Sequence, residues 1–364
     1  MDKYGIDNQK IVYHPERVAE WLQAGDDWEK AKKVYPIYIE ISPSGACNHR
    51  CVFCAVDYIG YKPVFLNTEK LTSALTQMGE KKVKSVMFGG EGEPLLHPQI
   101  IELTNHAKSS GIDVSYTTNG VLLSEKFLQK ALSSITWIKV SLNAGSPETY
   151  QQIHRAQSDD FHRVIQNLKR AVEIKRAGGL NCTLGAQMIL LPENKHEVVA
   201  LANLLKEIGL DYFVVKPYSQ HHFSLTKRYE DIKYESFLGL AEELKKISDD
   251  KFSAIFRDRT MKKWDAQEKS YQICHATPFF WAYLMANGDL YSCSAFLSDE
   301  RFNCGNINQQ SFVEIWEGEK RKNNWALLKD NFNITECRNN CRMDEVNRFL
   351  WQLKNQPPEH VNFI

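Results

Sequence analysis

The sequence has no excess of either charge and no apolar stretch long enough to cross a bilayer. Of its 364 residues, 45 are Lys or Arg and 45 are Asp or Glu, so no overall charge attracts nucleic acid or an anionic membrane. A transmembrane helix needs about 20 consecutive apolar residues, and residues 1–7 (MDKYGID) lack the hydrophobic core of a secretory signal. Internal repeats and low-complexity tracts are absent too. These absences favour a cytoplasmic protein with neither a nucleic-acid nor a membrane partner.

Nine cysteines are many for a chain without a signal sequence. Disulfides are rare in reducing compartments, so we expect metal ligation instead. Cys47, Cys51 and Cys54 have the spacing C-x3-C-x2-C and directly follow the apolar run 37–42. A cubane iron-sulfur cluster takes four thiolates, and three leave one iron open to chelate a cofactor. Zinc or a group of buried thiols is the alternative, although zinc sites usually pair their cysteines as C-x2-C. His49, inside this loop, is expected to be solvated.

Two segments resemble signatures of the radical SAM superfamily. Residues 47–54 (CNHRCVFC) have the form of its cluster-binding loop, and the resemblance implies that Phe53 lies beside the adenine of S-adenosylmethionine (SAM). Residues 86–94 (VMFGGEGEP) resemble its glycine-rich segment. Gly89 and Gly90 allow the backbone to turn and approach a ligand, and the Glu91 carboxylate can pair with the amino group of SAM. A plain strand-to-helix turn is the alternative for this second segment taken alone.

The pattern of apolar residues predicts an α/β fold. Strands are expected at 37–42, 84–88, 112–117, 136–142, 182–190 and 211–216, and helices near 67–78, 97–110, 121–132, 160–177 and 195–208. Strands that alternate with helices through short connections predict a parallel sheet with right-handed crossovers. Six such units predict a partial (β/α)6 barrel, whose chemistry lies at the C-terminal ends of the strands. Both signature segments follow a predicted strand.

We expect five segments along the chain. Residues 1–36 form an N-terminal helical segment with one helix over 14–34, and residues 37–225 form the barrel. Residues 226–269, rich in Lys, Asp and Glu, form a connecting helical segment. Residues 270–345 form a small α+β iron-sulfur extension, and residues 346–364 a C-terminal tail.

Polar residues near later strand ends are further candidates for the site. Ser141 and Asn143 close the fourth strand, and Arg155 follows. The family often uses a serine and an arginine here to hold the SAM carboxylate, a task that suits the planar guanidinium. A surface arginine is usually only solvated, so both possibilities stay open for Arg155. Gln187 points inward or outward on the fifth strand and is a candidate for lining the pocket, and Lys216 ends the sixth strand.

The last third of the chain contains a second group of cysteines. Asn287-Gly288 predicts a hairpin turn between residues 281–286 and 290–293. Gly288 to Cys293 have the pattern G-x4-C, and Cys337 to Cys341 have the pattern C-x3-C. Together these patterns resemble the C-terminal extension called SPASM, or its shorter relative twitch, which holds auxiliary clusters. Two auxiliary clusters need about seven cysteines and five are present, so we expect one auxiliary 4Fe-4S cluster. Zinc is the alternative. The resemblance assigns as ligands Cys274, Cys293, Cys337 and Cys341.

Two cysteines stay without a ligand role. Cys182 begins a predicted buried strand and is expected to pack in the core. Cys304 lies where the extension turns back, and three roles stay open for it: a spare thiol near the active site, an alternative ligand or a packed residue.

The resemblance implies an enzyme that cleaves SAM to a 5'-deoxyadenosyl radical and removes hydrogen from a small molecule such as a sugar or aminocyclitol. Its implied reductant is a flavodoxin- or ferredoxin-type protein. We favour oxidation of an alcohol, with the auxiliary cluster accepting the second electron, as in aminocyclitol dehydrogenases. One alternative is an epimerase in which Cys304 returns the hydrogen atom. Another is a peptide-modifying enzyme, although about 36 residues before the barrel are few for a leader-binding domain. The SAM segment disfavours a non-catalytic electron carrier.

Overall fold

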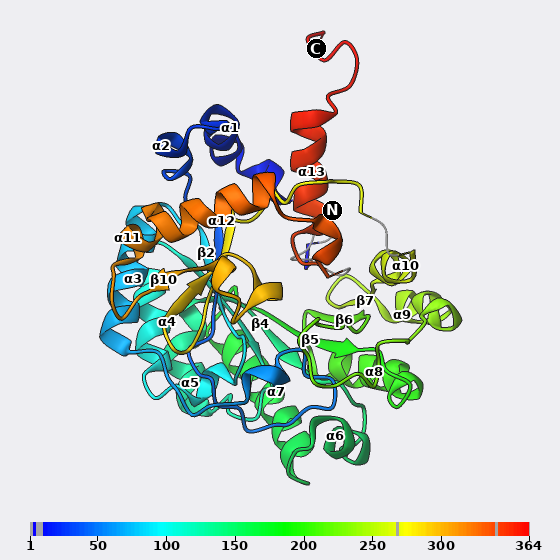
Figure 1. Ribbon diagram of the computed structural model, residues 1–364. Helices are drawn as coiled ribbons and strands as arrows, with labels where there is room; N and C mark the ends of the chain where they lie inside the picture. Colours follow the sequence, from blue (N-terminus) through cyan, green and yellow to red (C-terminus); the bar gives the residue numbers. More distant parts are fainter. Residues whose placement is uncertain (1–2, 5–9, 267–268, 339–340, 364) are drawn as a thin grey trace.

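One sheet of ten strands organises the protein (Figure 1). The computed structural model describes residues 3–4, 10–266, 269–338 and 341–363. The strand order is β10-β9-β8-β1-β2-β3-β4-β5-β6-β7. The strands are β1 Tyr38–Ile41, β2 Ser85–Phe88, β3 Asp113–Thr118, β4 Ile135–Ser141, β5 Thr183–Ile189, β6 Tyr212–Lys216, β7 Ser253–Phe256, β8 Trp281–Leu284, β9 Asp289–Tyr291 and β10 Asn303–Asn306.

All six expected barrel strands are present, and neighbouring strands from β1 to β6 pair in parallel. The alternation of side chains along a strand explains the layers. On β1, Ile39 and Ile41 join the main apolar core under the helices, whereas Tyr38 points into a cavity inside the barrel. The expected barrel helices are also confirmed: α3 Thr68–Glu80, α4 Ile100–Ser109, α5 Glu125–Ala131, α7 Asp160–Ala177 and α8 Val198–Ile208; α6 Pro147–His154 lies between β4 and α7.

The segment expected to be a helical connection contains a further strand-helix unit. Helix α9 Leu240–Ile247 is followed by β7, which pairs in parallel with β6, and then by α10 Asp258–Ala266. The strand SAIF is only four residues long and lies at the edge of the sheet. Its apolar signal is therefore weak within a segment of mostly charged residues.

The cysteine-rich extension continues the barrel sheet instead of standing apart from it. Strand β8 pairs in parallel with β1, and β9 and β10 add antiparallel strands beyond it. The expected hairpin is confirmed, with Gly288 at φ +93° in its turn. Two helices follow, α11 Phe312–Glu317 and α12 Glu319–Asp330. The expected tail begins with a further helix, α13 Asp344–Asn355, whose Leu350 is fully buried.

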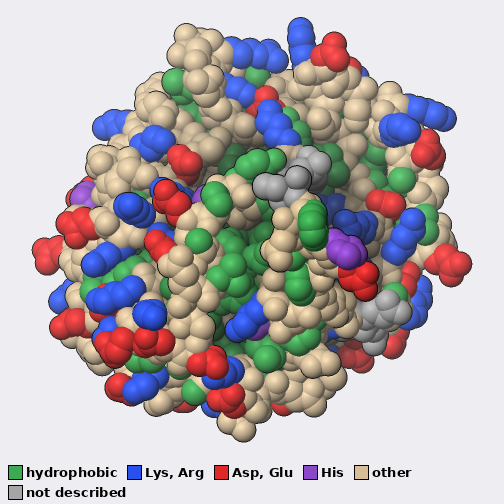
Figure 2. Space-filling model, turned by 90° about the horizontal axis from the view of Figure 1, so that it is seen from above, with side chains coloured by type: hydrophobic (Ala, Val, Ile, Leu, Met, Phe, Trp, Pro, Cys, Tyr) green, Lys and Arg blue, Asp and Glu red, His purple; other side chains and the backbone are tan. Residues whose placement is uncertain are grey.

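The N-terminal segment has two helices where one was expected, α1 Pro15–Ala24 and α2 Trp28–Ala31. Gly25 ends α1 at φ +52°, and the Asp27 side chain caps α2 by accepting a hydrogen bond from the Glu29 amide. Residues 1–2 and 5–9 of this segment lie outside the described residues. Among the described helices, none is both long and apolar enough to cross a membrane. On the face seen in Figure 2, acidic and basic side chains are interspersed.

Arg321 joins the N-terminal helices to the C-terminal extension. Its guanidinium is fully buried and donates to the carbonyl oxygens of Pro278 at 3.0 Å, Trp316 at 2.7 Å and Val34 at 3.2 Å. It also lies 4.0 Å from the centre of the Trp316 ring. Burial lowers the pKa of Arg321 to about 9. Only a planar fork with several donors satisfies these carbonyl groups together.

We therefore expect Arg321→Lys to destabilise the protein by about 3 kcal/mol, because a lysine leaves buried carbonyl groups without donors. Chemical denaturation of the purified variant measures this loss. The matched control is Lys322→Gln, a change at the neighbouring half-exposed side chain, which should cost less than about 0.5 kcal/mol. Equal stabilities for the two variants would show that Arg321 does not hold the N-terminal helices to the C-terminal extension.

Candidate functional site

The cysteine loop follows β1 and is attached to the end of α6. The Arg50 amide donates to the His154 carbonyl at 3.0 Å, and the Val52 amide to the Ile153 carbonyl at 2.9 Å. Arg155 ends α6 in the left-handed conformation at φ +48°. The loop is therefore held by backbone contacts from an element more than 90 residues later in the chain.

The three thiols of this loop lie close together. Burial raises the pKa of Cys47 to about 11, and burial followed by the charges of Cys54 and Cys47 raises the pKa of Cys51. Thiolates that are buried and repel one another need a cationic partner. These residues therefore fit an iron-sulfur cluster, whose irons supply that charge.

Glu91 offers an unsatisfied carboxylate oxygen near this loop. One oxygen accepts from the Ala286 amide at 3.1 Å, while Oε2 is buried without a partner among the described residues. Burial raises the pKa of Glu91 to about 7. Gly90, at φ +106°, has no room for a side chain because a Cβ would lie 2.4 Å from the Tyr283 hydroxyl. A buried carboxylate with a free oxygen fits the ammonium group of SAM.

Glu93, two residues later, has a structural role instead. Its carboxylate accepts from the Thr118 hydroxyl at 2.6 Å, the Asn119 amide at 2.8 Å and the Leu95 amide at 3.1 Å. These bonds tie the loop after β2 to the end of β3. Burial raises the pKa of Glu93 also to about 7.

The three candidates after β4 have different environments. Ser141 accepts from the Gln187 side-chain amide at 3.0 Å, and Gln187 lines a cavity, as expected. Asn143 is fully buried, and its side chain contacts the Ile189 amide and His154. Arg155 is exposed and lines neither described cavity. A contact of these residues with the SAM carboxylate stays a prediction.

Two histidines beside Cys51 were missed as site residues. His49 is not solvated as expected: it is 1% exposed, and its Nε2 lies 3.3 Å from the Asp160 carboxylate. His154 is also buried, and its Nδ1 lies 3.3 Å from Cys51 Sγ. No short sequence motif contains His154, and its place beside Cys51 becomes visible only when the end of α6 is seen against the cysteine loop.

The second group of cysteines is also assembled. Burial, followed by the charges of Cys341 and Cys274, raises the pKa of Cys293 to about 12. A hydrogen bond to Cys337, and then burial, raise the pKa of Cys341. The four sulfur atoms are thus close enough to interact, and these cysteines fit a closed auxiliary cluster.

Nitrogen donors point at three of these four sulfur atoms. The Ala295 amide lies 3.4 Å from Cys293 Sγ, and the Met343 amide 3.3 Å from Cys341 Sγ. Asn347, on α13, places its side-chain nitrogen 3.3 Å from Cys274 Sγ. Its oxygen accepts from two backbone amides, of His275 and Ala276, which fixes the orientation of the amide group.

The remaining two cysteines are packed in the protein interior. Cys182 is 3% exposed within the main apolar core, as expected. Cys304, on β10, is also 3% exposed and belongs to the same core as Ile315 and Trp316. Its sulfur faces the Phe302 carbonyl at 3.8 Å. Neither cysteine lines either of the two cavities described below.

A cavity of about 260 Å³ lies between the two cysteine groups, at the C-terminal ends of the strands. Phe53 reaches it from the first cysteine loop and Arg338 from the second. Its described lining residues include five cations and no Asp or Glu. The cations are Lys139, Lys216, Arg257, Arg338 and Arg342.

Two of these cations belong to the second cysteine group. Arg342 forms an ion pair with Glu40 of β1 and donates to the Tyr38 hydroxyl at 3.0 Å. Arg338 is partly buried, and its Nε has no partner among the described residues. Burial, followed by the charge of Arg338, lowers the pKa of His221 to about 4.

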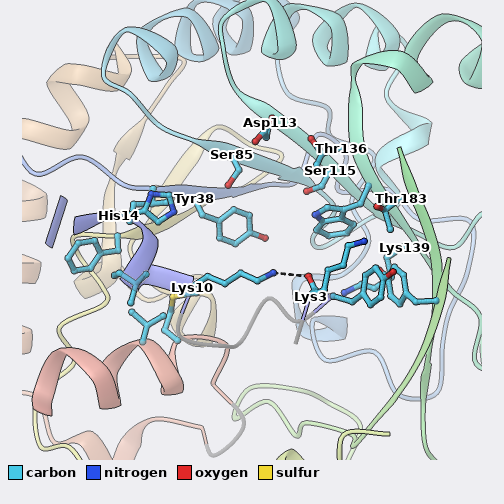
Figure 3. A pocket seen from close by; sticks show the side chains of 18 residues that line it. Lys3, Lys10, His14, Tyr38, Ser85, Asp113, Ser115, Thr136, Lys139 and Thr183 are labelled. Atoms are coloured by element: carbon cyan, nitrogen blue, oxygen red, sulfur yellow. Dashed lines mark hydrogen bonds between the residues drawn. The ribbon is translucent and has the colours of Figure 1, made fainter. Parts of the chain in front are cut away.

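A larger cavity of about 470 Å³ lies at the opposite end of the barrel (Figure 3). It is lined by the first residues of several strands, including Ser85, Asp113 and Thr183. Lys10 also lines it and donates a hydrogen bond to the Lys3 carbonyl at 3.0 Å. Because barrel chemistry gathers at the C-terminal ends of strands, we place the site in the smaller cavity.

Comparison with protein families identifies two domains. Residues 41–205 match the radical SAM superfamily, and residues 274–342 match SPASM, an iron-sulfur cluster-binding domain. The chain therefore contains a radical SAM domain followed by a SPASM domain. The first implies a 4Fe-4S cluster and SAM as cofactors, and the second an auxiliary iron-sulfur cluster.

Curated relatives match parts of the chain. A GTP 3',8-cyclase of Chlorobaculum tepidum is 33% identical over 199 residues, which are 53% of this chain and 57% of the relative. The tungsten-containing aldehyde ferredoxin oxidoreductase cofactor-modifying protein of Pyrococcus furiosus is 22% identical over 308 residues, which are 78% of this chain and 81% of the relative. The chain thus spans little more than half the length of the first relative.

Solved structures share the fold. SuiB of Streptococcus suis, bound to SAM, has a TM-score of 0.62 at 19% identity over 79% of this chain and 66% of that one. The structure of anSMEcpe, also with bound SAM, has a TM-score of 0.57 at 17% identity over 88% of this chain and 96% of that one.

The two neighbouring glutamates should respond differently to mutation. We expect Glu91→Gln to weaken SAM binding tenfold or more, because a charge-assisted contact is worth about 1.5 to 3 kcal/mol. Calorimetry with the cluster in place measures this. Glu93→Gln is the control: it should lower stability, because it weakens buried hydrogen bonds, and change SAM affinity less. Unchanged affinity in Glu91→Gln would exclude this contact.

Glu91 also predicts a pH dependence of stability in the metal-free protein. Its pKa rises from 4.5 to about 7 on folding, so the folded protein retains a proton that the unfolded chain releases. The contribution of this group is complete below about pH 4.5 and is lost as the pH rises through about 7. Glu91→Gln should remove that part of the decline in denaturation measurements between pH 5 and 8.

Proposed function

We propose that this chain, a radical SAM protein with a SPASM domain, oxidises an alcohol group of a small anionic molecule. The observation that supports this most is Arg338, which lines the cavity between the two cysteine groups and has a buried Nε without a partner among the described residues. A guanidinium with an unused donor in such a cavity favours a phosphate or carboxylate group.

The chain's own residues would bind and orient such a substrate. Arg338, with its unpartnered Nε, is the candidate for pairing with the anion. Arg342 is held by Glu40 and positions the second cysteine loop over the barrel. Phe53 forms one wall and limits the access of water. When bound, SAM and the two clusters supply a hydrogen-abstracting radical and an acceptor for one electron.

The balance of the reaction is that of a two-electron oxidation. Converting an alcohol to a ketone removes one hydrogen atom, one electron and one proton. One electron from the cluster that Cys47, Cys51 and Cys54 would hold would cleave SAM to methionine and the 5'-deoxyadenosyl radical. The hydrogen atom would end in 5'-deoxyadenosine, the cluster that Cys274, Cys293, Cys337 and Cys341 would hold would accept the second electron, and the proton would be released to water. One SAM would be consumed for each product.

Two observations favour this over the alternatives. Epimerisation needs a thiol at the substrate, whereas Cys304 is 3% exposed within the main apolar core. SuiB has been solved bound to the precursor peptide SuiA, but at 18% identity that likeness concerns the fold alone. The name of one curated relative, a GTP 3',8-cyclase, is in keeping with a small anionic substrate.

Arg338 gives a test of the anion site that needs no identified substrate. Inorganic pyrophosphate should bind to the SAM-loaded protein in calorimetry, and Arg338→Met should weaken that binding tenfold or more while SAM affinity stays within about twofold. Arg170→Met, at an exposed position on α7, is the control for loss of one positive charge. Iron content must equal that of the wild type. Pyrophosphate that binds equally to wild type and Arg338→Met would remove Arg338 from the site.

The reaction outcome distinguishes oxidation from epimerisation. The reduced holoenzyme, incubated in heavy water with phosphorylated and carboxylated alcohols, should form a product two mass units lighter with no deuterium at the reacting carbon. Cys304→Ala should retain turnover, and Cys341→Ala should lose the product. A product of unchanged composition that contains solvent deuterium, lost on Cys304→Ala, would establish the epimerase instead. Mass spectrometry gives both results.

A further inference from the structure

The Cys51 sulfur contacts the imidazole ring of His154, and Asn143 fixes the orientation of that ring from its opposite side. His154, the last residue of α6, is 1% exposed, and its Nδ1 lies 3.3 Å from Cys51 Sγ. On the far side of the ring, Nε2 lies 3.3 Å from both the backbone and the side-chain nitrogen of Asn143. The ring therefore bridges Asn143 and a predicted ligand of the first cluster.

The hydrogen bonds of Asn143 determine where the imidazole proton lies. The Asn143 backbone nitrogen is a donor. Its side-chain oxygen accepts from the Ile189 amide at 2.7 Å, so its side-chain nitrogen, also a donor, faces His154. With two donors directed at Nε2, that atom must present its lone pair. A neutral imidazole has one N–H, so the proton lies on Nδ1 and points at Cys51 Sγ.

The second histidine near Cys51 has the opposite arrangement. His49 directs Nε2 at the Asp160 carboxylate, which can only accept. Its neutral ring then has a lone pair on Nδ1, an atom with no partner among the described residues. Ligand atoms of His49, Cys51 and His154 lie within 4.8 Å of one another. They do not form a metal site of their own, because His154 Nδ1 is protonated and its Nε2 faces two donors.

We propose that His154 donates a hydrogen bond from Nδ1–H to the Cys51 sulfur and thereby raises the reduction potential of the first cluster. Reduction adds negative charge that the cysteine sulfurs share, and a fixed N–H donor stabilises the reduced form more than the oxidised one. Neighbouring hydrogen bonds tune metal sites in this way. Asn143 acts through His154 as a positioning residue. The inference does not depend on the identity of the substrate.

The proposal predicts a shift in reduction potential, and two variants distinguish the effect of the N–H donor from the effect of losing the imidazole ring. His154→Leu removes the N–H, whereas His154→Asn keeps a side-chain nitrogen donor near the position of Nδ1. Titration followed by electron paramagnetic resonance gives the potential of the cluster whose signal changes when SAM is added. We expect His154→Leu to lower the reduction equilibrium constant about tenfold, which is about 59 mV for one electron. His154→Asn should recover at least half of that shift. The auxiliary cluster serves as the internal control and should not move.

An unchanged potential in His154→Leu, or equal shifts in the Leu and Asn variants, would overturn the proposal. The second readout uses the wild-type protein, so it remains available if a variant does not assemble its cluster. With 15N-labelled histidine, pulsed resonance of the reduced first cluster should detect coupling to a histidine nitrogen, transmitted through the N–H···S bond. Absence of that coupling in the labelled wild type would contradict the hydrogen bond directly.

Discussion

The parallel pairing of β1 with β8 is the interaction on which the arrangement of the site depends. Tyr38 to Ile41 align with Trp281 to Leu284. Strand β1 leads directly into the first cysteine loop, and β8 leads through a hairpin to Cys293. Because β9 runs antiparallel to β8, Cys293 follows the end of the hairpin opposite to the end at which the first cysteine loop leaves β1. The ion pair of Arg342 with Glu40 ties the last cysteine segment to β1. A cavity lined from both groups follows from the strand pairing together with this ion pair.

Much of this organisation was predictable because it depends on local patterns. The six barrel strands have apolar runs, and the hairpin has Asn287-Gly288. Strand β7 was missed because four residues at a sheet edge give little signal among charged neighbours. The break between α1 and α2 depends on the left-handed conformation of Gly25. The sequence pattern alone predicted one continuous helix through this position. The pairing of β8 with β1 joins residues about 240 positions apart, and no local pattern encodes it.

The site shows the same limit at the level of single side chains. The cysteine spacings predicted both groups, but not which polar residues surround them. Arg155 was a candidate because its chemistry suits a carboxylate, yet it ends α6 at φ +48° and is exposed. The residue before it, His154, faces the sulfur. The two cysteine groups then have one feature in common: a side-chain nitrogen, oriented by hydrogen bonds to backbone groups, faces a cysteine sulfur. In the first group it is His154 at Cys51, and in the second it is Asn347 at Cys274. Such donors favour clusters at both positions over unliganded thiols.

The central claim is that two iron-sulfur clusters face one cation-lined cavity. Anomalous diffraction from crystals grown without oxygen, with data collected on both sides of the iron and zinc absorption edges, tests it most directly. The account predicts two iron peaks, one at Cys47, Cys51 and Cys54 and the other enclosed by Cys274, Cys293, Cys337 and Cys341. A zinc peak at the second position, or an iron peak at only one of the two, would contradict it.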